Sequence, residues 1–71
     1  MREKIQSKFG RIVKKERLKA GLSQEKLAEK ARMHRTYIGM IERGEKNITI
    51  ANIEKISKAL NISIANLFGQ I

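Results

Sequence analysis

The chain of 71 residues has no cysteine, no proline and no tryptophan, and it has a single histidine. Without cysteine no disulfide bond can form, and a zinc site built around His34 would need several carboxylates gathered beside it. No long apolar run is present, so we expect neither a signal peptide nor a membrane-spanning helix. These absences predict a cytoplasmic protein that holds no metal and no other cofactor.

Acidic residues are also scarce, at 7 against 16 lysines and arginines, and the formal net charge is +9. Residues 1–46 hold 14 of the 16 basic and 6 of the 7 acidic side chains, whereas residues 47–71 carry a net charge of only +1. A surface this basic favours a polyanionic partner, so we expect the first two-thirds of the chain to face a nucleic acid. The alternative is that the lysines only keep a small protein soluble.

The first predicted helix has its apolar residues on one face, at Ile5, Phe9, Ile12 and Val13. It should run to Ala20 and end at Gly21, since glycine accepts a left-handed backbone most cheaply. Basic side chains cover its other faces. A basic amphipathic helix can instead lie on an anionic membrane, but the narrow apolar stripe and the lack of tryptophan disfavour this alternative.

A repeated pattern predicts four more helix starts, near residues 24, 35, 50 and 64. In each case an apolar residue precedes a candidate N-cap, and a second apolar residue follows four positions after the cap, as in a hydrophobic staple. The caps are Ser23, His34, Thr49 and Ser63, of which His34 is the weakest. The fourth helix should bury Ile50, Ile53, Ile56 and Leu60. Five helices and no strand are therefore expected.

Residues 24–43 read as two short helices joined by a tight turn. Each has apolar residues at helical spacing, and the second begins with the polar run His34-Arg35-Thr36-Tyr37. Such side chains are costly to bury and are suited to contact with the edges of DNA bases.

The runs HRTYI at 34–38, IER at 41–43 and NIT at 47–49 make the chain resemble the helix-turn-helix family of phage repressors and Cro/C1-type regulators. Within that family it is most similar to controller proteins of bacterial restriction-modification systems. The resemblance implies an all-α, compact five-helix, lambda-repressor-like DNA-binding domain over residues 1–71. It also implies an ion pair between Arg17 and Glu42 that joins the first and third helices, the alternative being two separate surface charges.

Four side chains of the second helix of this pair are candidates for reading bases: Arg35, Thr36, Tyr37 and Met40. Arg35 can bond guanine through two N–H groups, and Thr36 can meet thymine with its methyl group. Each candidate has an alternative. Arg35 would then bind phosphate, Thr36 would be an ordinary surface residue, Tyr37 would pack on a neighbour and Met40 would border the core.

The candidates for binding phosphate lie at the start of the first of the two helices, in the first turn of the second helix and around its end: Ser23, Gln24, Tyr37, Arg43, Lys46 and Asn47. Gln24 would act together with the free backbone amides at that helix start.

The chain departs from the family pattern at two positions. Arg32 stands at the corner between the helices, where glycine is usual, and should have a positive φ. Gly39 lies inside the second helix, either for close approach to DNA or for a tight contact.

Residues 61–71 carry five apolar side chains and no charge: Ile62, Ile64, Leu67, Phe68 and Ile71. Part of this surface must close the core, but a short terminal helix can bury only one face. We therefore expect these five side chains also to supply an isologous homodimer interface.

The function that follows is a sequence-specific, double-stranded DNA-binding transcription regulator. The resemblance implies a dimeric controller protein that acts on its own promoter region, with RNA polymerase as a further partner. Alternatives are a Cro-like phage repressor, and an antitoxin or architectural protein that uses the same fold to hold a partner. No spacing suggests a catalytic nucleophile and base, so no enzyme is expected. There is also no room for a domain that binds a small-molecule effector.

Overall fold

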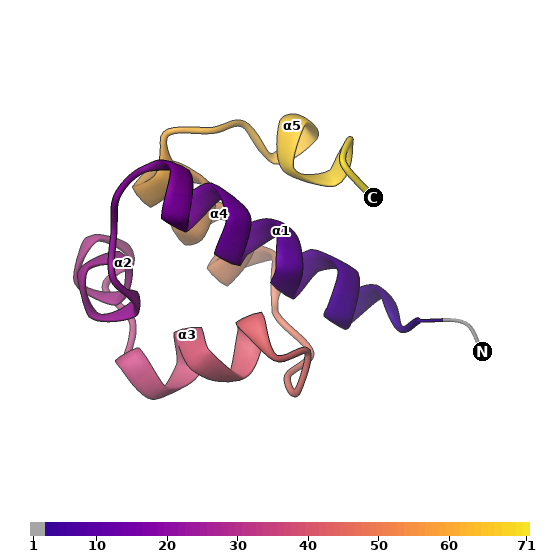
Figure 1. Ribbon diagram of the computed structural model, residues 1–71, viewed down its shortest axis with the longest axis horizontal. Helices are drawn as coiled ribbons and strands as arrows, with labels where there is room; N and C mark the ends of the chain where they lie inside the picture. The colour runs from indigo at the N-terminus through magenta and orange to yellow at the C-terminus, as the bar shows by residue number, and fades with distance from the viewer. Residues whose placement is uncertain (1–2) are drawn as a thin grey trace.

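The computed structural model describes residues 3–71, which form five α-helices and no strand. The helices are α1 (Ile5–Lys19), α2 (Gln24–Ala31), α3 (Arg35–Glu42), α4 (Ile50–Leu60) and α5 (Ile64–Phe68). The longest helix, α1, contacts α3 on one side and α5 on the other, while α2 contacts α3 and α4 (Figure 1). Within residues 3–71, no helix is both long and apolar enough to span a membrane. The predicted all-α, five-helix fold is confirmed.

The four predicted helix starts are confirmed at residues 24, 35, 50 and 64. Three N-cap side chains accept a hydrogen bond from the backbone N–H three positions later, at 3.0 to 3.2 Å: Ser23, Thr49 and Ser63. His34 makes no such bond through its side chain. At every start the apolar residue before the cap packs half-buried against the core, and its staple partner is buried. The staples therefore tie each helix start to the core.

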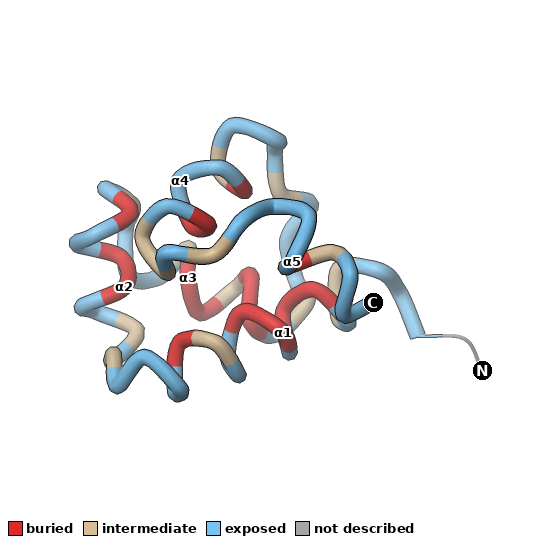
Figure 2. Tube along the Cα trace, turned by 90° about the horizontal axis from the view of Figure 1, so that it is seen from above, coloured by how far each residue is buried: buried red, intermediate tan, exposed pale blue. Residues whose placement is uncertain are grey.

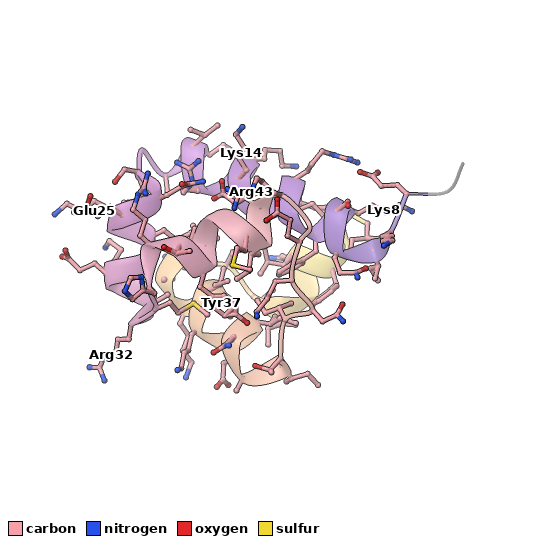
Figure 3. The ribbon with its side chains drawn as sticks, turned by 90° about the horizontal axis from the view of Figure 1, so that it is seen from below. Lys8, Lys14, Glu25, Arg32, Tyr37 and Arg43 are labelled. Atoms are coloured by element: carbon pink, nitrogen blue, oxygen red, sulfur yellow. The ribbon has the colours of Figure 1, made fainter. Side chains whose placement is uncertain are left out.

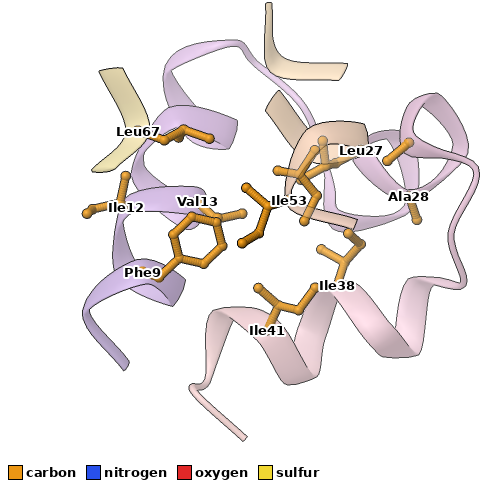
Figure 4. Packing of buried hydrophobic residues seen from close by; sticks show 11 residues of the cluster. Phe9, Ile12, Val13, Leu27, Ala28, Ile38, Ile41, Ile53 and Leu67 are labelled. Atoms are coloured by element: carbon orange, nitrogen blue, oxygen red, sulfur yellow. The ribbon is translucent and has the colours of Figure 1, made fainter. Parts of the chain in front are cut away.

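The core lies between α1, α2, α3 and α4, and Leu67 of α5 closes it (Figure 4). The largest fully buried side chains come from all five helices: Val13, Leu27, Ile38, Ile56 and Leu67. In Figure 2 the buried parts of the helices face one another and the exposed parts face solvent. The expected buried side of α4 was partly wrong: Ile53 and Ile56 are buried, but Ile50, the first residue of the helix, is 80% exposed and Leu60, the last, is half-buried.

Helices α1 and α3 approach closely at Gly10. A Cβ atom at this position would lie 2.7 Å from the carbonyl oxygen of Glu42, closer than real Cβ atoms come to backbone atoms of another helix. Only glycine therefore allows the backbone of α1 to touch the end of α3. This contact fixes how far α3 stands from the rest of the domain.

The corner between α2 and α3 is built on Arg32, whose φ is +55° and whose backbone is left-handed. The backbone N–H of Met33 donates to the carbonyl of Ala28 at 2.9 Å, which closes the last turn of α2. The predicted positive φ at Arg32 is therefore confirmed, and a residue with a Cβ atom occupies a conformation that favours glycine.

Candidate nucleic-acid interface

The first turn of α3 faces solvent on a firmly held helix. Ile38 and Ile41 are buried in the core, whereas Arg35 and Thr36 are exposed. Figure 3 looks onto the side of the molecule on which α3 lies, and Tyr37 and Arg43 stand on that side. The first turn therefore offers side chains to a partner without any part of the core being opened.

Tyr37 is half-buried and contacts two other parts of the chain. Its hydroxyl accepts a hydrogen bond from Nδ2 of Asn52 in α4 at 3.1 Å, and Nζ of Lys46 lies 5.9 Å from the centre of its ring. Met40, one turn after Thr36, is also half-buried. Asn52 was missed by the sequence reasoning, because nothing in its local pattern distinguishes it from an ordinary solvent-facing residue of α4.

A buried ion pair connects α1 to α3. Nε of Arg17 lies 2.7 Å from Oε2 of Glu42, Nη2 donates to Oε1 at 3.1 Å, and Nη1 donates to the carbonyl of Leu22 at 2.8 Å. The structure therefore brings together the two residues that the family resemblance paired. The same carboxylate also accepts a bond from Nε2 of Gln24 at 3.1 Å. Glu42 thus holds three helices at one point.

Gln24, expected only as a phosphate ligand, also has a structural role through this bond. Its amide nitrogen donates to Glu42, and the side chain is half-buried at the start of α2. Ser23 beside it accepts from the backbone N–H of Lys26. Both candidate phosphate ligands at this helix start therefore also have structural partners.

Arg43, the residue after α3, is exposed and pairs with Glu45. Its Nε lies 2.8 Å from Oε2 of Glu45 and its Nη2 lies 3.3 Å from Oε1. This hydrogen bonding lowers the pKa of the Glu45 carboxyl below its ordinary value and raises the pKa of the Arg43 guanidinium. Glu45 therefore keeps its charge to a lower pH than an isolated carboxylate would. Glu45 was not among the candidate site residues. Its position two residues after Arg43 could have indicated that the two side chains pair.

The turn after α3 is anchored at its far end. Asn47 accepts a hydrogen bond from Nε2 of Gln6 in α1 at 2.8 Å. Lys46 and Asn47 are both exposed, on the loop that connects α3 to α4. The structure places five of the six candidate phosphate ligands around the two ends of the helix-turn-helix, whereas the sixth, Tyr37, lies in the first turn of α3 among the candidate base-reading residues.

The C-terminal segment requires one correction. Leu67 was expected at a dimer interface, but within a single chain its side chain is 0% exposed. It faces inward at the contact of α5 with α1 and α4, so it closes the core and leaves no surface for a second copy. Phe68 stacks on Phe9 with ring centroids 5.2 Å apart and is also half-buried.

Apolar surface remains on this segment after that correction. Ile64 is 38% exposed and Ile71 is 43% exposed, and Ile62 is half-buried. We refer to Ile62, Ile64 and Ile71 as the C-terminal face. It lies on α5 and its flanks, while the candidate interface lies on α3.

Comparisons with known proteins agree with this geometry. A helix-turn-helix family model matches residues 13–67. Control protein C.BamHI of Bacillus amyloliquefaciens is 50% identical over 68 residues, covering 94% of this chain and 84% of that protein. The crystal structure of the restriction-modification controller protein C.AhdI from Aeromonas hydrophila has a TM-score of 0.87 at 41% identity, covering 89% of this chain and 96% of the other.

A further solved structure contains nucleic acid. It is the restriction-modification controller protein C.Esp1396I, a tetramer in complex with its natural 35 base-pair operator. Its chain has a TM-score of 0.87 and 41% identity, covering 96% of this chain and 90% of that chain. These matches confirm the resemblance drawn from the sequence. The chain belongs to the helix-turn-helix family of restriction-modification control proteins.

Proposed function

We propose that the protein is a sequence-specific, double-stranded DNA-binding transcription regulator, and that it is a dimeric controller protein that acts on the promoter region of its own restriction-modification system. The observation that carries the proposal is the exposed polar first turn of α3, held on a buried apolar side and flanked at both ends by basic and amide side chains. The operator complex of the relative C.Esp1396I supports it.

In this proposal α3 enters the major groove and its first turn reads bases. Arg35 bonds a guanine through two N–H groups, and Thr36 contacts a neighbouring base edge. Both remaining candidates are half-buried: Tyr37 reaches a phosphate or responds to the shape of the groove, and Met40 makes an apolar contact with a base. Asn52 positions the Tyr37 ring through the bond to its hydroxyl.

The other phosphate contacts come from the two ends of the helix-turn-helix: Ser23, Gln24, Arg43, Lys46 and Asn47. Gln24, the first residue of α2, donates to Glu42 through Nε2, and the free backbone amides at this helix start also favour an anion. The net charge of +9 makes binding depend strongly on salt, with a slope of roughly 0.9 per phosphate neutralised.

The whole of residues 1–71 forms one domain in this proposal, with the helix-turn-helix at about 24–43 and a dimerisation segment at about 61–71. Two copies related by a two-fold axis through the C-terminal face would set their α3 helices roughly 34 Å apart, so that each meets the same face of the duplex one helical turn from the other. Repression would follow from occupying the promoter. Activation would require a contact with RNA polymerase.

Selection of bound fragments from a random duplex pool at near-physiological salt tests the proposal. We expect an enriched two-fold motif with half-sites about 10 base pairs apart. The Arg35→Ala variant, selected in parallel, should enrich a motif that is degenerate at one position of each half-site. If the wild-type protein binds DNA at low salt but enriches no motif, the positive charge serves non-specific contact and the proposal fails.

A further inference from the structure

Arg43, at the end of α3, is expected to bind a DNA phosphate, but its guanidinium is already paired with the carboxylate of Glu45. Arg43 directs Nε and Nη2 at the two carboxylate oxygens of Glu45, at 2.8 and 3.3 Å. A phosphate presents two oxygens to a guanidinium in the same forked arrangement. The N–H groups that face Glu45 therefore cannot bond a DNA phosphate at the same time.

The pair lies where the DNA backbone is expected to run. A Cβ atom added at Gly39 would lie 3.1 Å from Nη1 of Arg43 and 3.8 Å from Oε1 of Gln24. The guanidinium thus lies over the bare backbone of α3, and the two side chains expected to hold phosphate converge on the same glycine from opposite ends of the helix-turn-helix. Gln24 is held there by the buried Glu42, whereas Arg43 is held by an exposed carboxylate.

We propose that Glu45 competes with the DNA phosphate for Arg43 and so lowers the affinity of the protein for every duplex, without changing which sequence it prefers. The inference rests on the proposed function of DNA binding. On binding, phosphate oxygens replace the Glu45 oxygens at Nε and Nη2 of Arg43, and the Glu45 carboxylate turns into solvent. The exchange involves the backbone of the DNA, so it carries no information about bases.

Competition from Glu45 should reduce non-specific DNA binding by this chain, whose net charge is +9. Each arginine that faces DNA without a counter-charge adds to non-specific binding, which competes with the operator for the protein. Glu45 neutralises one of these arginines in the free protein. Both side chains are more than half exposed, so the pair is weak enough to be exchanged when the phosphate arrives.

The test is the Glu45→Gln variant, which keeps the size and hydrogen-bonding capacity of the side chain and removes its charge. We expect Kd to fall about 1.5- to 5-fold per protomer, the range that corresponds to an exposed ion pair. The fall should be equal for the selected operator and for random duplex. The plot of log K against log salt should steepen by up to about 0.9 per protomer, because Arg43 then acts as an unneutralised charge.

Two matched measurements separate exchange at Arg43 from a general change in charge. Glu54→Gln removes an exposed carboxylate from α4 and should change Kd by less than Glu45→Gln does. In an Arg43→Gln background, Glu45→Gln should have no further effect. Equal effects of the two glutamate variants, or an undiminished effect of Glu45→Gln without Arg43, would overturn the inference.

The outcomes also distinguish this inference from the function beneath it. If the wild-type protein selects an operator and Glu45→Gln binds it with unchanged affinity and salt slope, only the competition at Arg43 is refuted. If the wild-type protein binds no duplex at any salt concentration, the proposed function is refuted and this inference with it.

Discussion

The carboxylate of Glu42 receives bonds from two side chains at once, Nε and Nη2 of Arg17 and Nε2 of Gln24. An unpaired carboxylate at such a buried position would be strongly unfavourable, whereas charge-assisted bonds from a forked guanidinium satisfy it. The pair therefore holds α3 to α1, and its remaining bond holds a candidate phosphate ligand. At the scale of single residues, the same side chain supports the fold and prepares the surface.

The roles of Arg35 and Lys46 can be distinguished by their sequence dependence. Arg35→Ala should weaken operator binding by roughly 1–3 kcal/mol and relax the preference at one base position. Lys46→Ala should weaken binding to all duplexes similarly and reduce the salt slope by about 1, because it removes a phosphate contact. Titrations of operator and random duplex at several salt concentrations measure both. Equal losses on operator and random duplex for both variants would show that these roles are wrongly assigned.

At the scale of elements, four helices end in the same way. A residue one or two positions past each helix has a left-handed backbone, at Gly21, Arg32, Gly44 and Asn61. The next backbone N–H in each case reaches back to a carbonyl five residues earlier, at 2.9 to 3.1 Å. Glycine and asparagine are usual in this conformation, and arginine is not. Arg32 is therefore the one strained cap among the four.

Arg32→Gly should stabilise the protein. Relief of the left-handed strain is worth roughly 1–2 kcal/mol, and the greater freedom of glycine in the unfolded chain offsets about 0.4–1 kcal/mol of it. The net gain is therefore up to about 1.6 kcal/mol, and each 1 kcal/mol of it would raise Tm by roughly 4–8 °C. Asn61→Gly, at the matching cap of α4, should gain less because asparagine tolerates this backbone better. Thermal denaturation followed by circular dichroism measures both, and a clear fall in Tm for Arg32→Gly would contradict the strain argument.

Two glycines inside helices should respond to alanine in opposite ways. At Gly10 an added methyl group meets the backbone carbonyls of α3, so Gly10→Ala should cost roughly 1–3 kcal/mol despite better helix propensity. At Gly39 the nearest atom is the flexible end of Arg43, which can move, so Gly39→Ala should gain up to about 1 kcal/mol. Urea unfolding measures both stabilities. A gain at Gly10 would mean that α1 and α3 can separate without loss.

At the scale of the whole molecule, charge and apolar surface lie on different parts of the chain. Basic and polar side chains surround α3, whereas the exposed isoleucines of the C-terminal face lie on α5 and its flanks. A domain with a radius of gyration of 10.9 Å is too small to read two turns of DNA alone. The separation of the two surfaces allows a second copy to bind without covering the first turn of α3.

The proposed dimer is tested by a matched pair of substitutions. Ile64 and Ile50 are each the first residue of a helix behind a serine or threonine cap, and both are exposed. Ile64→Glu should weaken dimerisation about tenfold or more, because fully burying an isoleucine contributes about 1.5–3 kcal/mol, Ile64 has 38% of its surface left to bury, and the two-fold axis doubles the loss. Ile50→Glu should leave the dimer intact. Sedimentation equilibrium measures both, and the reverse pattern would place the interface on α4.

The sequence by itself determined where the helices begin and which turn of α3 is left polar. These features are local: a cap acts on the N–H three positions later, and a staple joins residues five apart. That is why Ser23, Thr49 and Ser63 could be identified from spacing, whereas the positive φ of Arg32 was expected from the family resemblance, in which glycine usually occupies this corner.

Only the tertiary structure determined which surface side chains are hydrogen-bonded to another helix. The bond from Asn52 to Tyr37 joins α4 to α3, and the bond from Gln24 to Glu42 joins α2 to α3. The burial of Leu67 and the absence of space at Gly10 depend on how closely helices approach each other. The pattern within one helix shows which face is apolar, but it does not contain the distance to the next helix. That distance determines which of these residues support the fold and which remain free for DNA or a second copy.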